Sequence, residues 1–370
     1  MAKKKLRVGV LFGGRSGEHE VSLLSAASIL KAIDRKKYEI VPIGISKVGR
    51  WLVDDAAQTL LTGATDSNPL QIEATASSSE LIAEPATLSG AIDVIFPVLH
   101  GTFGEDGTIQ GLLEMADLPY VGSGVLGSAA AMDKDAMKKL FAAAGLPQTP
   151  HVTLLRSEWR SDPKKCIKGI EKALAYPLFV KPANLGSSVG ISKVKKRSEL
   201  AGAMDLAASF DRKLIIEQGV GGPGAKPREL EVAVLGNDLP EASIVGEIVP
   251  AKEFYDYEAK YQLSGPDESI SILPAKLTIA QQKQIRSMAL QAFRACDCSG
   301  LARVDFLMEP TGAKRVYLNE INTMPGFTSI SMYPKLWATS GLPYKQLIDR
   351  LIGLALERHA EKQQTAFTLN

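Results

Sequence analysis

The chain has 370 residues, of which 45% are hydrophobic and 23% are charged, a composition typical of a globular protein with two or three domains. Its 43 lysines and arginines nearly balance 41 aspartates and glutamates, so no net field favours nucleic acid or an anionic membrane as a partner. Any binding of phosphate must therefore depend on local charges.

Cysteine usage and the N-terminal segment predict a cytoplasmic protein. Cys166, Cys296 and Cys298 form neither a disulfide framework nor a Cys-x-x-Cys metal pair, and we expect the last two to be buried, inert thiols. A sparse, odd count is typical of a reducing compartment. The basic start MAKKKLRVGVLFGG has a short apolar stretch and no small-residue cleavage pattern, which argues against a signal peptide. No apolar run approaches the roughly 18–20 residues that a membrane-spanning helix requires.

Strands and helices alternate in the first third of the sequence. Short apolar runs that close on glycine predict buried parallel strands, and apolar residues at helical spacing predict the helices between them. The predicted strands are 6–14, 38–46 and 91–101, and the predicted helices are 20–33 and 108–117. This order predicts a βαβ unit. Residues 54–90, rich in Ser, Thr and Ala, are predicted to be irregular.

A second set of predicted helices and strands begins near residue 125. Asp133 is predicted to cap one helix, and Thr278 with Gln281 forms a capping box that opens another. The other predicted elements are two strands within 176–195, a helix from 198, strands at 213–220, 228–236, 241–250, 301–308 and 315–322, and a helix at 344–361. The predicted division is into three α/β modules, at 1–125, 126–218 and 219–370.

Four polar side chains alternate along the last two predicted strands. Because side chains two positions apart point to the same face of a strand, Arg303 shares a face with Asp305, and Glu320 shares one with Asn322. If the strands pair antiparallel, Asp305, Glu320 and Asn322 converge. Two carboxylates and an amide oxygen are hard ligands that suit Mg²⁺. The alternative is a solvated strand face, on which alternating polar residues are normal.

A Gly/Ser loop, NLGSSVG at 184–190, separates two predicted strands. Its glycines allow backbone N–H groups to approach phosphate oxygens, and Lys181 and Lys193 lie on the strands at either side. The loop is not a Walker A motif, and an ordinary hairpin loop is the alternative. Lys134 and Lys138, four residues apart on a predicted helix, either add positive charge or form a solvated face.

A glycine-rich turn, GGRSGEHEVS at 13–22, joins the first predicted strand to its helix. Such a turn can bind a dinucleotide pyrophosphate at a helix N-terminus. The G-x-G-x-x-G spacing is absent, however, and the carboxylates of Glu18 and Glu20 would repel an anion. Glu18 therefore favours an ammonium-bearing ligand, and the alternative is a charge that only stabilises the helix.

A second polar segment, EFYDYEAKYQ at 253–262, combines three tyrosines with acids and lysines. Its alternation fits neither a strand nor a helix. It is interpreted as a mobile loop that closes over a charged site, or as an ordinary surface loop.

Together these motifs resemble those of the D-alanine–D-alanine ligases, a family of the ATP-grasp superfamily. The similarity runs from Val8 to about Leu351. The motifs that carry it, in chain order, are GGRSGEHEVS, HGTFGEDGTIQGLLE, LPYVGSG, MDKDAMK, KPANLGSSVGISKV, FYDYEAKY, RVDF and NEINTMPGFTSIS. The resemblance implies an α/β, three-module ATP-grasp architecture: a Rossmann-like N-terminal domain with a parallel sheet for the substrate, a central domain with a glycine-rich lid, and a C-terminal domain with the metal site and a mobile loop at 250–270.

The resemblance implies an ATP site between the central and C-terminal modules. The residues implied are Lys134, Lys181, Ser187 and Ser188 at the phosphates, Glu217 and Val220 at adenine through their backbones, and Glu229 at the ribose. Asp305, Glu320 and Asn322 match the family's ligands for two Mg²⁺ ions, for which Mn²⁺ is expected to substitute. The family often has lysine where Gln218 stands, so this chain lacks that charge beside the base.

The resemblance also implies roles at the two amino-acid subsites. Glu18 would anchor the ammonium of the first D-alanine, with His100 near its carboxylate, and Lys260, Ser331 and the Met332 N–H would hold the carboxylate of the second. Arg303 and the Gly326 N–H would stabilise the oxyanion. Glu18, Ser187 and Tyr261 would form a hydrogen-bonded set that closes the loop and assists deprotonation of the amine.

The implied reaction is the ATP-dependent ligation of two D-alanines to D-alanyl-D-alanine through an acyl phosphate, which supplies peptidoglycan precursor synthesis. The alternative within the superfamily is a D-alanine–D-lactate or other D-amino-acid ligase; relatives that use D-lactate often carry histidine where Tyr261 stands. A nucleotide-binding regulator without turnover and a dehydrogenase are the readings from other classes. The resemblance further implies a cytoplasmic homodimer whose small-molecule substrates are D-alanine and ATP.

Overall fold

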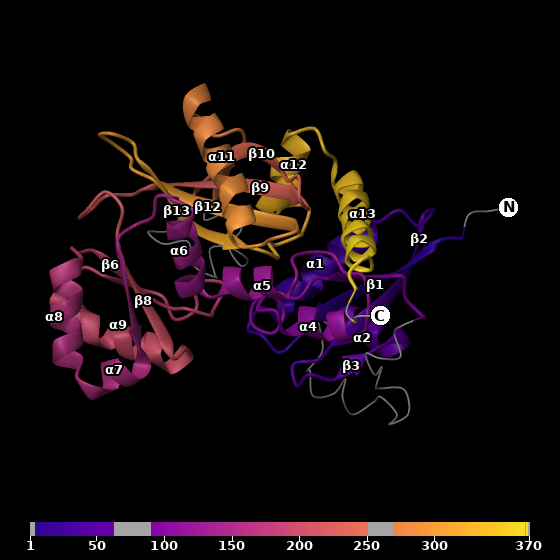
Figure 1. Cartoon of the computed structure of the whole chain (residues 1–370), viewed down its shortest axis with the longest axis horizontal. Coiled ribbons are helices and arrows are strands. Elements are labelled where there is room, and N and C mark those ends of the chain that lie inside the picture. Colours follow the sequence, from indigo (N-terminus) through magenta and orange to yellow (C-terminus); the bar gives the residue numbers. More distant parts are fainter. Residues whose placement is uncertain (1–3, 63–89, 251–268, 367, 369–370) are drawn as a thin grey trace.

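The computed structural model describes residues 4–62, 90–250, 269–366 and 368. They form a mixed α/β structure with three sheets, as Figure 1 shows. The predicted α/β class is confirmed. Within these residues, no helix is both long enough and apolar enough to cross a bilayer.

The N-terminal sheet has the strand order β3-β2-β1-β4. Strands β1 (Leu6–Gly13), β2 (Tyr38–Ile45) and β4 (Val94–Pro97) are parallel, and the short β3 (Trp51–Leu52) pairs antiparallel with β2. The accompanying helices are α1 (His19–Ala32), α2 (Asp54–Thr62), α4 (Thr108–Met115) and α5 (Val125–Met132). The parallel strands confirm the prediction from their near-continuous apolar runs.

The prediction of irregular structure for residues 54–90 is wrong at its start. Residues Asp54–Thr62 form α2, which buries Ala57 and Leu60 and packs against β2. Because only two apolar residues of this short helix are buried, its periodicity is too weak to stand out in the sequence. Residues 63–89 of the predicted segment lie outside the described residues.

The central sheet is antiparallel, with the order β5-β8-β6-β7. Its strands are β5 (His151–Leu155), β6 (Leu178–Pro182), β7 (Ser192–Val194) and β8 (Lys213–Gln218), and its helices are α6 (Lys134–Ala143), α7 (Arg156–Ser161), α8 (Pro163–Ala173) and α9 (Arg197–Phe210). The Gly/Ser loop connects β6 to β7, as predicted. In Figure 1, α7, α8 and α9 gather at one end of the molecule, far from the N-terminal sheet.

The C-terminal sheet has the order β11-β10-β9-β12-β13 and is antiparallel throughout. Its strands are β9 (Arg228–Gly236), β10 (Glu241–Val249), β11 (Ile270–Ile272), β12 (Gly300–Met308) and β13 (Val316–Asn322). Helix α11 (Ile279–Ala295) packs apolar residues against one face of it. The other face carries the polar residues discussed below and borders α12 (Met332–Thr339) and α13 (Tyr344–Lys362).

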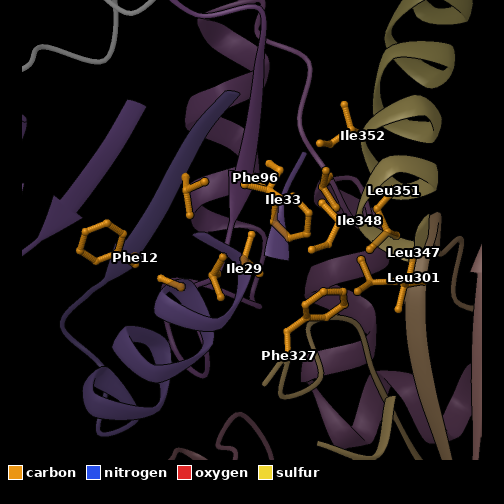
Figure 2. Close-up of a cluster of buried hydrophobic side chains, with 14 of the residues drawn as sticks. Phe12, Ile29, Ile33, Phe96, Leu301, Phe327, Leu347, Ile348, Leu351 and Ile352 are labelled. Carbon is orange, nitrogen blue, oxygen red and sulfur yellow. The ribbon is translucent and has the colours of Figure 1, made fainter. Parts of the chain in front are cut away.

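A hydrophobic cluster joins the first and last parts of the chain. Helix α13 contributes Leu347, Ile348, Leu351 and Ile352, each at most 1% exposed, and these pack with Phe96 and other residues of the N-terminal sheet and α1. Figure 2 shows Ile29, Ile33 and Phe96 facing these side chains, with Leu301 and Phe327 beside them. The amphipathic C-terminal helix therefore faces the core, as its spacing predicts.

Candidate active site

Two adjoining cavities lie between the three sheets. One, of about 270 Å³, is bordered by residues of the N-terminal turn, the Gly/Ser loop and the C-terminal sheet. The other, of about 390 Å³, is bordered by the central and C-terminal sheets. They share Ser188, Arg303 and Glu320 among their lining residues, so a ligand in one borders a ligand in the other.

Every predicted site residue that the structure describes lines at least one cavity. The smaller cavity is lined by Glu18, His100, Lys134, Ser187, Ser188, Arg303, Glu320, Asn322, Gly326, Ser331 and Met332. The larger is lined by Lys181, Ser188, Glu217, Val220, Glu229, Arg303, Asp305 and Glu320. Lys260 and Tyr261, together with the rest of the predicted loop, lie outside the described residues.

Glu217 of β8 lies between two lysines in the larger cavity. Its buried carboxylate forms ion pairs with Lys181 of β6 and with Lys138 of α6. Burial opposes ionisation of Glu217, but the two ammonium groups hold its pKa well below the usual range. Lys181 lines the cavity and also interacts with Glu229 and Glu320, so its ammonium group is a cation that an anionic ligand in the cavity would meet. Lys138 is 1% exposed, so the alternative of a solvated helix face is wrong for it.

Part of the wall of the larger cavity is apolar. Phe179, Ile191, Val220 and Phe306 line it, and apolar side chains of this kind bind an aromatic base. Gln218, where the family often has lysine, is used within the fold, because its Oε1 accepts a hydrogen bond from the Ala175 N–H (2.9 Å).

The predicted convergence of polar residues on the last two strands is present. β12 and β13 pair antiparallel, with Asp305 opposite Glu320 and Arg303 opposite Asn322. Opposite residues in such a pair point to the same face, so two carboxylates and one amide border the cavities. Their hard oxygens fit a divalent cation. No group of three or more His, Cys, Asp or Glu side chains in the described part of the chain is arranged to hold a metal, and the third donor here is an amide.

Lys134, the first residue of α6, connects the Gly/Ser loop to these carboxylates. Its Nζ donates a hydrogen bond to the Leu185 carbonyl (2.9 Å) and lies 3.9 Å from Glu320 Oε2. The helix is fixed at this end because the Asp133 carboxylate accepts hydrogen bonds from two of its first N–H groups, as predicted. A cation is thereby held between the Gly/Ser loop and the Glu320 carboxylate of β13.

Arg303, whose side chain is 15% exposed, lies beside two carboxylates. Its Nε and Nη2 donate to the two oxygens of Asp305 (2.7 and 2.6 Å), and Nε lies 3.3 Å from Glu231 Oε2. Although burial disfavours a charged guanidinium, these neighbours hold the pKa of Arg303 well above its usual value. A permanent positive charge therefore stands where the two cavities meet.

Glu18 meets the Gly/Ser loop from the N-terminal side of the smaller cavity. A Cβ at Gly186 would lie 2.6 Å from Glu18 Oε1, and one at Gly101 would lie 3.1 Å from it. The next two residues of the loop, Ser187 and Ser188, have φ values of 49° and 61°, in the left-handed region. The loop thus turns sharply over a buried carboxylate, and only glycine fits where the two meet.

His100 lines the smaller cavity, but both of its ring nitrogens have partners within the protein. Nδ1 lies 2.9 Å from the Met324 carbonyl and Nε2 lies 3.1 Å from Ser25 Oγ. Burial lowers the pKa of His100, with Glu18 acting in the opposite direction. A neutral ring in a fixed orientation follows, so direct contact with a carboxylate requires an exchange of partners.

The N-terminal end of helix α12 lines part of the smaller cavity. Ser331 is its N-cap but makes no side-chain cap to the helix, since its Oγ bonds with Thr328 instead. The first N–H groups of α12, including that of Met332, are therefore available to an anion. Lys335, on the next turn, also lines this cavity.

Comparison with known proteins identifies the family. A model described as the D-Ala–D-Ala ligase N-terminus matches residues 7–123, and one described as the D-Ala–D-Ala ligase C-terminus matches residues 140–353. The chain belongs to the D-alanine–D-alanine ligase family. The predicted resemblance is thus confirmed.

Individual relatives of this ligase family cover nearly the whole chain. The D-alanine–D-alanine ligase of Natranaerobius thermophilus is 52% identical over 98% of both chains, and that of Geobacillus thermodenitrificans is 52% identical over 98% of this chain and 99% of its own. Among solved structures, the D-alanine–D-alanine ligase of Coxiella burnetii has a TM-score of 0.79 at 37% identity, covering 98% of this chain and 97% of its own. VanG D-Ala:D-Ser ligase of Enterococcus faecalis has a TM-score of 0.80 at 36% identity, covering 95% and 100%.

Several charged cavity residues of this ligase-family chain had no predicted role, among them Glu105, Glu231 and Lys335. Glu231 lines both cavities, and Glu105 and Lys335 line the smaller one. Glu231 stands two positions after Glu229 on β9, so strand alternation was a usable signal for it. Lys335 stands one helical turn after Ser331, but α12 itself was not predicted. Glu105 offered no signal, because its burial follows from loop packing.

Proposed function

We propose that this chain joins two molecules of D-alanine to D-alanyl-D-alanine with the hydrolysis of ATP to ADP and phosphate. Membership of the D-alanine–D-alanine ligase family supports this activity. The strongest support is the position of Asp305, Glu320 and Asn322 at the boundary between the two cavities. The larger cavity is lined by apolar side chains and Lys181, and the smaller one is more polar. Such an arrangement brings a nucleotide's terminal phosphate next to a small substrate.

ATP is assigned to the larger cavity. The adenine would lie against Phe179 and Val220, with backbone groups near Glu217 and the ribose near Glu229. Lys181 at the base of this cavity and Lys134 at its junction with the smaller one are the cations for the phosphates. Ser187 and Ser188 of the Gly/Ser loop would cover them.

A divalent metal is implied by the family, and we assign it to Asp305, Glu320 and Asn322, as two Mg²⁺ ions for which Mn²⁺ substitutes. Bound there, it neutralises charge on the phosphates and orients them for in-line transfer. The protein's own contribution is a rigid hairpin that fixes both carboxylates in register.

In the first step the carboxylate of one D-alanine attacks the γ-phosphorus of ATP, so that an acyl phosphate forms and ADP leaves. Glu18, 8% exposed, holds the substrate's ammonium group, and His100 lies near its carboxylate. Phosphoryl transfer of this kind needs positioning and charge neutralisation more than covalent catalysis. Lys134 and Lys181 provide cations for that charge.

In the second step the amine of the other D-alanine attacks the acyl carbon, and phosphate leaves. Arg303 and the Gly326 N–H stabilise the oxyanion, and both border the smaller cavity. Ser331, the Met332 N–H and Lys260 hold the acceptor carboxylate. Glu18, Ser187 and Tyr261 are assigned the closing of the site and the loss of the amine proton. Closure matters because water would hydrolyse an acyl phosphate.

A D-Ala:D-Ser ligase matches the fold as well as a D-alanine–D-alanine ligase does, but the relatives at 52% identity are D-alanine–D-alanine ligases, which favours D-alanine as the acceptor. Tyrosine at position 261 favours an amine acceptor over D-lactate. We further propose three modules with boundaries near 125 and 218, a homodimeric state, and a role in the cytoplasm in supplying peptidoglycan precursors.

A coupled assay tests the proposed function. The protein is incubated with ATP and Mg²⁺ and with D-alanine alone, or with D-alanine plus D-lactate or D-serine, and products are identified by mass spectrometry. We expect phosphate release with D-alanyl-D-alanine as the main product in every mixture. A main product that contains D-lactate or D-serine would replace the acceptor assignment, and phosphate release without any ligated product would refute the ligase.

A further inference from the structure

A third carboxylate stands in the same row as the two implied metal ligands. β9 pairs with β12 so that Glu231 lies opposite Asp305, which in turn lies opposite Glu320 on β13. Opposite residues in antiparallel strands share a face, so the three carboxylates point toward the cavities. Glu231 is 7% exposed and lines both cavities.

Arg303 links this third carboxylate to the metal ligands. It lies on the same strand as Asp305, two positions away, and donates to both oxygens of that carboxylate. Its Nε is also 3.3 Å from Glu231 Oε2. One guanidinium therefore lies between two carboxylates, of which only Asp305 belongs to the implied metal ligands.

A divalent cation would compete with Arg303 for Asp305. A carboxylate can bind both, but the two positive charges repel each other strongly at such short range and low exposure. An arginine held by Asp305 alone would then be displaced, or would hinder binding of the metal. A second carboxylate outside the ligand set removes this conflict, because the guanidinium keeps a partner.

We propose that Glu231 is a positioning residue that holds the Arg303 guanidinium in place when a divalent cation binds Asp305. The inference rests on the proposed function, in which Arg303 stabilises the oxyanion. Glu231 is not itself assigned as a ligand, since no cluster of three carboxylates, histidines or cysteines suited to a metal occurs within the described residues. Its effect on the reaction passes through Arg303.

The central variant is Glu231→Gln, which keeps the shape of the side chain and removes its charge. We expect kcat to fall by about tenfold or more, because a misplaced catalytic group loses that much. The KM for D-alanine and the affinity for Mn²⁺ in the presence of ADP, measured by electron paramagnetic resonance, should change by less than about threefold. Glu231→Asp, which restores the charge, should recover most of the lost kcat.

A double-mutant cycle separates action through Arg303 from any other role. In an Arg303→Lys background, whose own kcat is reduced but measurable, Glu231→Gln should cost less than about threefold, because the coupled residues do not add. A matched control is Glu309→Gln, just beyond the end of β12 and outside the residues that line either cavity. Its side chain is 12% exposed, against 9% for Glu231, and it is also paired with an arginine, Arg315, at 2.8 and 2.9 Å. It should leave kcat within about threefold of wild type.

Four results would overturn the proposal while the wild type remains active. A tenfold loss of Mn²⁺ affinity in Glu231→Gln would make Glu231 a metal ligand. If Glu231→Gln lowers kcat as much in the Arg303→Lys background as in the wild type, Glu231 acts independently of Arg303. Unchanged kcat with a lowered melting temperature, or an equal loss of kcat in Glu309→Gln, would make the role of Glu231 merely structural. An inactive wild type would instead count against the proposed function.

Discussion

Glu217 and its two lysines show how a single residue's role depends on partners that are distant in the sequence. Lys138, Lys181 and Glu217 come from α6, β6 and β8 and meet as one buried cluster. The sequence predicts Lys181 and Glu217 as site residues, but it leaves Lys138 between a binding role and a solvated face. Burial of Lys138 is decided by what packs over α6, which the spacing of charges along one helix does not reveal.

Asp305, Glu320 and Asn322 are the opposite case, because strand alternation together with antiparallel pairing of the two strands predicts that they share a face. Their register places them together. We expect Glu320→Gln to lower kcat/KM for ATP by about a hundredfold or more at limiting Mg²⁺, since it removes a charged ligand from the metal site. Steady-state kinetics at several Mg²⁺ concentrations measures this.

The matched control for that variant is Glu309→Gln. Glu309 lies just beyond the end of β12 and pairs with Arg315, remote from the metal-ligand row. The same change there should leave kcat/KM unaltered. Near-normal activity of Glu320→Gln at limiting Mg²⁺ would contradict the metal assignment.

Glu105 gives a prediction about pH. Burial, with a contribution from the Glu18 charge, raises its pKa from 4.5 to about 8. The native state therefore binds more protons than the unfolded state between these values, so the stability that the protonated Glu105 contributes is complete below about pH 4.5 and is lost as the pH rises to about 8.

The variant Glu105→Gln should remove this dependence, because an amide cannot ionise and still accepts the hydrogen bond from the Gly101 N–H (2.8 Å). We expect the free energy of unfolding of the variant, relative to that of the wild type, to be larger at pH 9 than at pH 6, so that the variant gains stability over the wild type as the pH rises. Urea unfolding at the two pH values measures this difference. A difference that does not change with pH would contradict the raised pKa.

Among the elements, α6 connects local sequence most directly to the site. Asp133 accepts hydrogen bonds from the N–H groups of Asp135 and Ala136 (3.1 Å each) and forms an ion pair with Lys213. We expect Asp133→Ala to lower the free energy of unfolding by about 1–2 kcal/mol. Because Lys134 is the next residue, the KM for ATP should rise as well.

Thr278→Ala is the control for this effect of a cap. Thr278 closes the capping box of α11 with Gln281, away from both cavities. It should cost about 1 kcal/mol of stability without any change in the KM for ATP. Equal changes in the KM for the two variants would show that Asp133 acts only through stability.

Elements with strong local signals were predicted well, and weakly patterned ones were not. The strands β9, β12 and β13 and the helices α1, α11 and α13 all agree with their predicted positions to within a few residues. The sequence analysis did not predict α2, α5, α7, α8 or α12. These helices have six to eleven residues each, and helices this short depend largely on tertiary packing for their stability.

At the scale of the whole molecule, α13 packs the C-terminal part of the chain against the N-terminal sheet. Its buried face packs with residues of the N-terminal sheet and the C-terminal sheet in one cluster (Figure 2). Its last turns add Arg358, which donates hydrogen bonds to Ser299 and lies 4.4 Å from the Tyr120 ring. The amphipathic pattern predicts that this helix is buried, but not which sheets it joins.

We expect Leu351→Ala to lower the free energy of unfolding by about 2–5 kcal/mol, because it leaves a cavity between the two sheets. Leu351 is fully buried, whereas Leu356 on the same helix is only partly buried, so Leu356→Ala should cost less than half as much. Urea unfolding followed by circular dichroism compares them. Equal losses would contradict the conclusion that the buried face of α13 stabilises the packing of the N-terminal sheet against the C-terminal sheet.

The most direct test of the whole account is anomalous diffraction from a crystal grown with Mn²⁺ and a non-hydrolysable ATP analogue. We expect manganese peaks within coordination distance of Asp305, Glu320 and Asn322, with the triphosphate reaching them from Lys181 and Lys134. Peaks elsewhere, or a nucleotide bound with its phosphates away from these three side chains, would contradict it.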